Sequence, residues 1–129
     1  MSNYYLSKLT NKSFEEAVGV VTERLKEEGF GVLTEIDVKG TLKKKLDVDF
    51  RKYLILGACN PGFAHKALTL DDKIGVFLPC NVIVQETAGG QTEVFAMNPE
   101  VAMAGMENPA LAELAQSVSA ALGRVVSGV

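Results

Sequence analysis

The chain of 129 residues has few of the groups that most often mark a chemical centre. It contains one histidine, His65, and two cysteines, Cys59 and Cys80, which lie 21 positions apart without a C-x-x-C motif. This spacing matches neither a disulfide framework nor a zinc ribbon, and it predicts two free thiols. No glycine-rich stretch has the spacing of a phosphate-binding loop, and no nucleophile elbow accompanies the histidine. We therefore expect no metal and no cofactor.

Long apolar runs and concentrated positive charge are also scarce. No run approaches the roughly 18 apolar residues of a membrane span, and the first ten residues lack the pattern of a secretory signal. We expect a cytoplasmic protein without a membrane partner. The net charge is −3, and the one basic cluster lies in residues 38–52. This distribution argues against nucleic acid as a partner. In a helix, Leu42 and Leu46 would share the buried side, and the lysines between them would face solvent.

The residues that are present describe an ordinary globular protein. Apolar residues make up 47% of the chain and charged residues 22%. This composition and length predict one domain, residues 1–129, with a single core. The long alanine-rich segment at the carboxyl end and the high apolar content predict a homodimer.

The first half of the chain alternates between strand and helix patterns. Residues 4–9 predict a strand, and a helix follows between a capping residue, Ser13, and a left-handed stop, Gly29. Residues 30–38 alternate as a strand, and a short lysine-bearing helix follows them. Residues 52–60 are apolar on both sides of the pleat, which predicts a central strand covered on both faces.

The second half begins with an apolar run, residues 73–87, that contains Pro79. Because proline cannot donate a ladder hydrogen bond, we divide this run into two strands at Pro79. Residues 88–91 predict a hairpin turn into a strand over 92–98, and the remainder is helical. Asn-Pro pairs begin at positions 60, 98 and 108. Each pair predicts a helix start, with asparagine as the cap and proline at the first helical position.

The segment "GACNPGFAHKAL", residues 57–68, is the candidate site. Cys59 would precede a helix cap, where free amides and the helix dipole favour a thiolate. Pro61 removes one of those amides, and strand-end cysteines are often small buried residues. His65 would activate Cys59 only by reaching back about one and a half turns. Cys80 could form a redox couple with Cys59 if parallel strands bring both thiols to one sheet edge, whereas we expect antiparallel strands to separate them.

Two blocks of this sequence resemble the family catalogued as domain of unknown function 302. The blocks are "TLKKKLDVDFRKYLILGACNPGFAHKAL" and "IGVFLPCNVIVQE", within residues of about 30–95. The resemblance implies an α+β fold with helices on one side of a mostly antiparallel sheet. The implied order is roughly β-α-β-β-β-β-α with short extra helices, which is similar to the TATA-binding protein. It implies no catalytic roles, and a shared fold does not transfer function.

Two functional hypotheses follow from these residues. The first is a non-catalytic domain that binds a small molecule or a protein partner in a cleft between sheet and helix. Its ligand-binding residues would be Asn60, Pro61, Gly62, Pro79 and Asn81. The second is a thiol-dependent enzyme or redox sensor that uses Cys59, with Cys80 resolving it or His65 assisting it.

Overall fold

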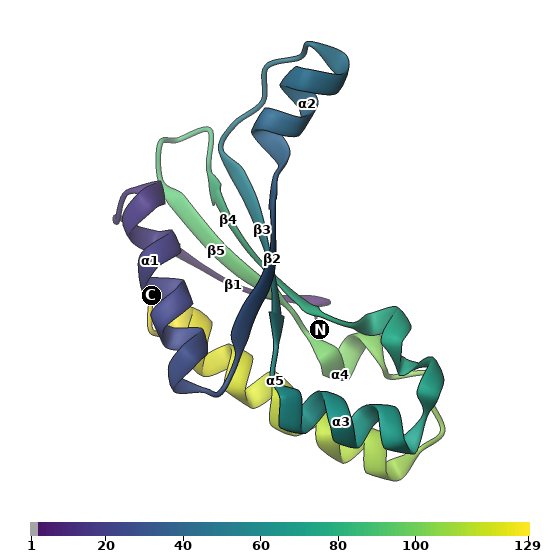
Figure 1. Ribbon diagram of the computed structural model, residues 1–129. Coiled ribbons are helices and arrows are strands. Elements are labelled where there is room, and N and C mark those ends of the chain that lie inside the picture. Colours follow the sequence, from purple (N-terminus) through teal and green to yellow (C-terminus); the bar gives the residue numbers. More distant parts are fainter. Residues whose placement is uncertain (1–2) are drawn as a thin grey trace.

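The centre of the molecule is a five-stranded antiparallel sheet (Figure 1). A computed structural model describes residues 3–129. The strands are β1 (Tyr5–Thr10), β2 (Gly31–Asp37), β3 (Tyr53–Cys59), β4 (Cys80–Glu86) and β5 (Thr92–Met97). They lie side by side in the order β1-β5-β4-β3-β2, and each neighbouring pair is antiparallel. The expected α+β class is therefore confirmed.

Two long helices cover one face of this sheet, and shorter helices lie at its two ends (Figure 1). The helices are α1 (Phe14–Glu27), α2 (Val38–Leu46), α3 (Pro61–Leu70), the 3-10 helix η1 (Asp72–Phe77), α4 (Pro99–Ala102) and α5 (Pro109–Ser127). Both covering helices, α1 and α5, pack into the main core with the sheet. The predicted order β-α-β-β-β-β-α, with short extra helices, is confirmed.

Local signals place the helix ends where the sequence predicts them. The hydroxyl of Ser13 accepts a hydrogen bond from the Glu16 amide at 3.1 Å, and Gly29 has a φ of +83° just after α1. Each Asn-Pro pair begins a helix, with the asparagine side chain accepting an amide hydrogen bond. These caps satisfy amides that have no partner inside the helix, and they fix where α3, α4 and α5 start.

The main core lies on the helix-covered face, and the strand register shows which side chains reach it. Leu56 lies opposite Val82, and Val84 lies opposite Val94. These four residues are buried against α1 and α5. Because strand side chains alternate between faces, the residues between them point to the other face. That second face is open, since α1 and α5 lie together on the first face (Figure 1).

Three expectations are corrected by the structure. Residues 73–78 do not form a strand; most of them belong to η1, where Ile74 is buried in a second, smaller apolar cluster. The apolar run before Pro79 therefore reflects local burial outside the sheet. The strand β3 lies inside the sheet but is covered by helices on one face only.

The third correction concerns the lysine-bearing helix. The helix α2 has no buried residue, and the Leu46 side chain is 66% exposed. Residues Leu42 and Leu46 therefore do not share a buried side. The helix projects away from the body beyond the β2–β3 end of the sheet, so it has little neighbouring surface to pack against (Figure 1).

Candidate functional site

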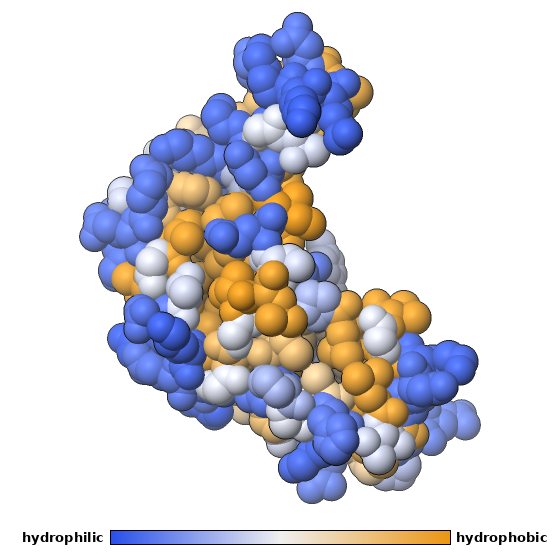
Figure 2. Space-filling model, viewed as in Figure 1, coloured by the Kyte–Doolittle hydropathy of each residue, from blue (hydrophilic) through white to orange (hydrophobic). Residues whose placement is uncertain are grey.

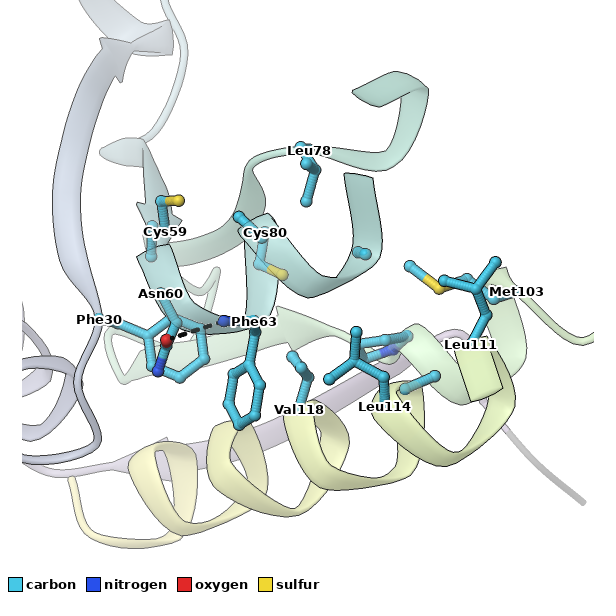
Figure 3. Close-up of a pocket in the computed structure, with 15 residues that line it drawn as sticks. Phe30, Cys59, Asn60, Phe63, Leu78, Cys80, Met103, Leu111, Leu114 and Val118 are labelled. Carbon is cyan, nitrogen blue, oxygen red and sulfur yellow. Dashed lines mark hydrogen bonds between the residues drawn. The ribbon is translucent and has the colours of Figure 1, made fainter. Parts of the chain in front are cut away.

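An apolar cavity lies at the end of the sheet opposite to α2. Its volume is about 40 Å³, and α3, α4 and α5 enclose it together with the ends of β3 and β4 (Figure 3). Its lining residues are Phe30, Ala58, Cys59, Asn60, Phe63, Ala64, Ala67, Leu78, Cys80, Pro99, Met103, Leu111, Leu114, Ala115 and Val118. Apart from the Asn60 amide, these side chains are hydrocarbon or carry a sulfur atom, so the cavity suits an apolar group.

The cavity lies where the two apolar clusters of the protein meet. Ala58, Cys80 and Val118 belong to the main core with the sheet. Ala67 and Leu111 belong to the smaller cluster formed by α3, η1 and the first turn of α5. The cavity is therefore bounded by two separately packed regions of the molecule.

Asn60 is fixed in place by hydrogen bonds at both ends of its side-chain amide. Its Oδ1 accepts from the amide of Phe63 at 3.2 Å, and its Nδ2 donates to the carbonyl of Glu28 at 3.2 Å. The first bond caps α3, and the second joins the start of α3 to the end of α1. The same side chain thus anchors the segment that carries Cys59.

The two thiols lie at the same edge of the sheet although β3 and β4 are antiparallel. Ala58 pairs with Cys80, so Cys59 is one residue beyond the partner of Cys80. The expectation that antiparallel strands separate the thiols is wrong, because the end of one strand lies beside the start of its antiparallel neighbour. Alternation then places the two side chains on opposite faces (Figure 3). Both cysteines are free.

Burial sets the chemistry of Cys80. Removal from water, with a smaller contribution from the charge of Cys59, raises the pKa of the Cys80 thiol to about 11. Desolvation disfavours the charged form, so Cys80 is a neutral thiol at physiological pH. Cys59 is half-buried, on the side of the strand away from the main core.

His65 lies on the exposed surface of α3, away from the cavity lining. It borders a surface groove of about 500 Å³ between α3 and α5. Lys66 and Glu113 also border this groove. The groove and the cavity share two lining residues, Phe63 and Leu114, so these side chains stand between the interior and the surface.

The predicted ligand-binding residues do not all gather at the cavity. Asn60 lines it, whereas Pro61 and Gly62 are exposed in the first turn of α3. Asn81 is also exposed and lies opposite Gly57 in the register, on the open face of the sheet. Pro79 directly precedes β4, follows a cis peptide bond at Leu78–Pro79, and lies close to Gly57.

The residues that sequence reasoning missed come mainly from α4 and α5. Met103, Leu111 and Leu114 form one side of the cavity. Leu111 and Leu114 belong to the apolar stripe of α5, whose later members pack in the main core with the sheet. The signal that separates them is their position in the first two turns, which extend past the sheet and face α3 instead.

No metal centre or membrane segment is evident in the part of the chain that the structure describes. Among residues 3–129, no cluster of three or more histidine, cysteine or acidic side chains is arranged to hold a metal ion. In the same range, no helix combines the length and apolar character needed to cross a bilayer.

The fold and the cavity define a small α+β domain with an antiparallel sheet and helices on one face. Residues 6–129 match the family described as Domain of unknown function DUF302, and the chain belongs to that family. The match extends well beyond the segment of about 30–95 on which the resemblance rested. No curated protein matches the chain.

A solved structure shares the whole arrangement. It is the crystal structure of an uncharacterized conserved protein DUF302 from Bacillus stearothermophilus, with a TM-score of 0.91 and 30% sequence identity. The similarity covers 98% of each chain. Neither the family nor this structure assigns a function to the chain.

Proposed function

We propose that this domain is a non-catalytic binding protein that takes a small amphipathic molecule between α3 and α5. The apolar part of the molecule would enter the cavity, and its polar end would stay in the groove beside His65 and Lys66. The observation that carries this proposal is the shared wall: Phe63 and Leu114 line both spaces. Movement of these two side chains would join the apolar interior to a polar surface.

The cavity must widen to accept more than a small group. A volume of about 40 Å³ is close to the roughly 30 Å³ that one water molecule occupies in the liquid. The smaller apolar cluster of α3 and η1 is separate from the main core. It could therefore move outward while the sheet keeps its packing, as local opening in proteins often involves such units.

The chemistry of the lining favours binding over catalysis. The polar side chain in the cavity, Asn60, already uses both ends of its amide in hydrogen bonds. Of the two cysteines that line it, Cys80 is held neutral by burial. No charged side chain lines the cavity, so no carboxylate or imidazole is in place there for acid–base chemistry.

A series of straight-chain carboxylates from four to ten carbons tests the proposal. We expect the melting temperature to rise with chain length until the cavity is full. A ligand at 100 times its Kd adds about 2.7 kcal/mol to the free energy of unfolding. Two-dimensional NMR of the same samples should show shifts for the amides of α3 and the first turns of α5. If no member of the series changes either signal, the proposal is wrong.

Matched variants locate the response. Ala64→Leu places extra carbon atoms in the cavity, where Ala64 is half-buried, and should remove the thermal shift. Ala120→Leu adds the same atoms at an exposed position of α5 and should leave the shift unchanged. A shift that survives Ala64→Leu would place the ligand somewhere else.

The second candidate is a thiol-dependent enzyme or redox sensor based on Cys59. The observation that favours it is the position of Cys59, which is half-buried beside the cavity and directly before α3. Two features oppose it: Pro61 has no amide to offer, and the Phe63 amide is already bound to Asn60. A couple with Cys80 would also require one thiol to reach the opposite face of the sheet.

Alkylation of the native protein across a pH range separates the two candidates. A Cys59 thiol with an apparent pKa well below about 8.5 would support the second candidate, and an ordinary value would remove it. The His65→Ala variant tests assistance, because an activating histidine should be needed for the lowered value. We place the protein in the cytoplasm, since two free cysteines suit a reducing compartment.

A further inference from the structure

The open face of the sheet carries an apolar surface that no part of the described chain covers. By strand register, its side chains alternate with those of the main core. The large apolar members of this open face are Tyr5, Leu9, Ile36, Tyr53, Ile55, Ile83 and Phe95. Tyr5 and Tyr53 lie on either side of Phe95, with ring centroids 6.4 and 6.1 Å from it. Leu9 and Ile36 are 52% and 48% exposed.

Two projections border this face at opposite ends of the strands. We call residues 38–52 the arm, which contains α2. We call residues 61–79 and 98–114 the lobe, which contains α3, η1, α4 and the start of α5. The molecule is hollowed between the arm and the lobe, and apolar residues are visible along the hollow (Figure 2).

The arm needs a packing partner. The helix α2 has nine residues and buries none of them, and its apolar residue Leu46 is 66% exposed. Isolated helices shorter than about 12 residues are marginal in water, and most helices in proteins depend on tertiary packing. Val48 adds exposed apolar surface on the arm.

The accessible surface of the chain supports the same conclusion. It measures 7523 Å², whereas a compact monomer of 13.8 kDa exposes about 6,600 Å² by the usual scaling with mass. The difference, roughly 900 Å², is similar to the about 800 Å² that each partner buries in a standard protein interface. One partner of this size would therefore bring the chain to a normal exposed area.

Charge indicates that the partner is a second copy of the same chain. The arm has six basic and two acidic residues, and the lobe has two basic and five acidic residues. In the described chain, Lys43 pairs with Asp47 and Asp49 inside the arm, and no ion pair involves Lys44 or Lys45. A twofold axis between two facing sheets, perpendicular to their strands, would set the arm of each copy against the lobe of the other.

We infer that the protein forms a symmetric homodimer in which the open sheet faces pack together and each arm lies on the partner's lobe. This interface differs from the one that the alanine-rich carboxyl-terminal helix predicted, because α5 is used by the core of its own chain. The inference also accounts for β3, whose sequence is apolar on both faces although helices cover only one. The second copy supplies the missing cover.

Sedimentation velocity over a dilution series measures this association directly. We expect a wild-type species of twice the 13.8 kDa chain mass that dissociates on dilution. Ile36→Glu and Leu46→Glu each place a charge at the proposed interface, and each should raise the dimer Kd by roughly thirtyfold or more. Both positions are at least 48% exposed in the single chain, so the fold should survive, and circular dichroism checks this.

Two further variants make the result specific. Ala120→Glu introduces the same charge at an exposed position of α5, away from the open face, and should leave the Kd unchanged. The double variant Lys44→Glu and Lys45→Glu should weaken the dimer and reduce its dependence on salt. A wild-type monomer at every concentration overturns the inference, and so does a dimer that both Ile36→Glu and Leu46→Glu leave intact.

Discussion

The two faces of the sheet have similar apolar composition but different surroundings. On one face Leu56, Val82 and Val84 are fully buried beneath α1 and α5. On the other face Ile55 and Ile83 alternate with them along the same strands and have no helix above them. The difference shows that apolar alternation predicts which residues need cover, while only the complete arrangement of chains shows what provides it.

The largest expected effect comes from one truncation on each face. Leu56→Ala removes a fully buried side chain and should lower the free energy of unfolding by about 2–5 kcal/mol. Ile55→Ala, its neighbour on the open face, should cost less than half of that when urea unfolding is measured at low protein concentration. Its cost should increase at high concentration, where the dimer forms. If Leu56→Ala and Ile55→Ala lower the free energy of unfolding equally at both concentrations, the two faces do not differ in cover.

The next effect uses the two thiols, which lie on opposite faces. The pKa of Cys80 is raised to about 11 in the folded state, above an unfolded value near 8.5. The folded state therefore favours the protonated thiol, and its contribution is complete below about pH 8.5 and lost as the pH rises through 11. Between these values the free energy of unfolding should fall by about 2–3 kcal/mol more in wild type than in Cys80→Ala. Cys59→Ala should keep most of the wild-type fall, because burial is the larger cause of the raised pKa of Cys80 and the charge of Cys59 the smaller one. A fall that is identical in Cys80→Ala would contradict the burial of this thiol.

A smaller effect tests the junction where the covered face meets the cavity. Asn60→Ala removes the cap of α3 and the hydrogen bond to Glu28, and should destabilise the protein by about 1–2 kcal/mol. Asn60→Asp keeps the acceptor but loses the donor, so it should show about half of that loss in thermal unfolding. If Asn60→Asp and Asn60→Ala destabilise the protein equally, the hydrogen bond between α1 and α3 contributes more to stability than the cap.

The smallest effect belongs to a polar side chain at the border of the open face. The Gln85 side chain accepts from Arg51 Nε at 2.7 Å and donates to Glu93 at 2.7 Å. Gln85→Ala should change monomer stability by less than about 0.5 kcal/mol, because the groups that it leaves can bind water. A loss above about 1 kcal/mol in urea unfolding at low concentration would show that this face is already closed in the single chain.

The helix starts and the hairpin were predictable because their signals are local. Asn98 and Asn108 cap helices through amides only two or three residues away. The turn between β4 and β5 needs only the positive φ of Gly90. These contacts form within short segments of the sequence, so they can be predicted without the rest of the chain.

The cavity and the surroundings of the arm depend on distant parts of the chain. Leu114 and Cys80 meet only after β4, α4 and α5 are placed around the sheet end. The apolar run that contains Ile74 has the pattern of a strand, but tertiary packing on α3 makes it a 3-10 helix. The spacing of Leu42 and Leu46 predicted a buried side for α2, and this prediction was wrong because no surface of the described chain lies beneath Leu46.

The close approach of Thr34 and Pro79 to Gly57 limits which sequences can adopt this sheet. A methyl group built on its Cα would collide with the hydroxyl oxygen of Thr34 and come within 3.0 Å of Pro79. Any side chain there would require the Thr34 hydroxyl and the Pro79 ring to shift. A replacement by alanine would therefore be accommodated best together with smaller residues at Thr34 on β2 and at Pro79 just before β4, which links the sequence choices at these three positions.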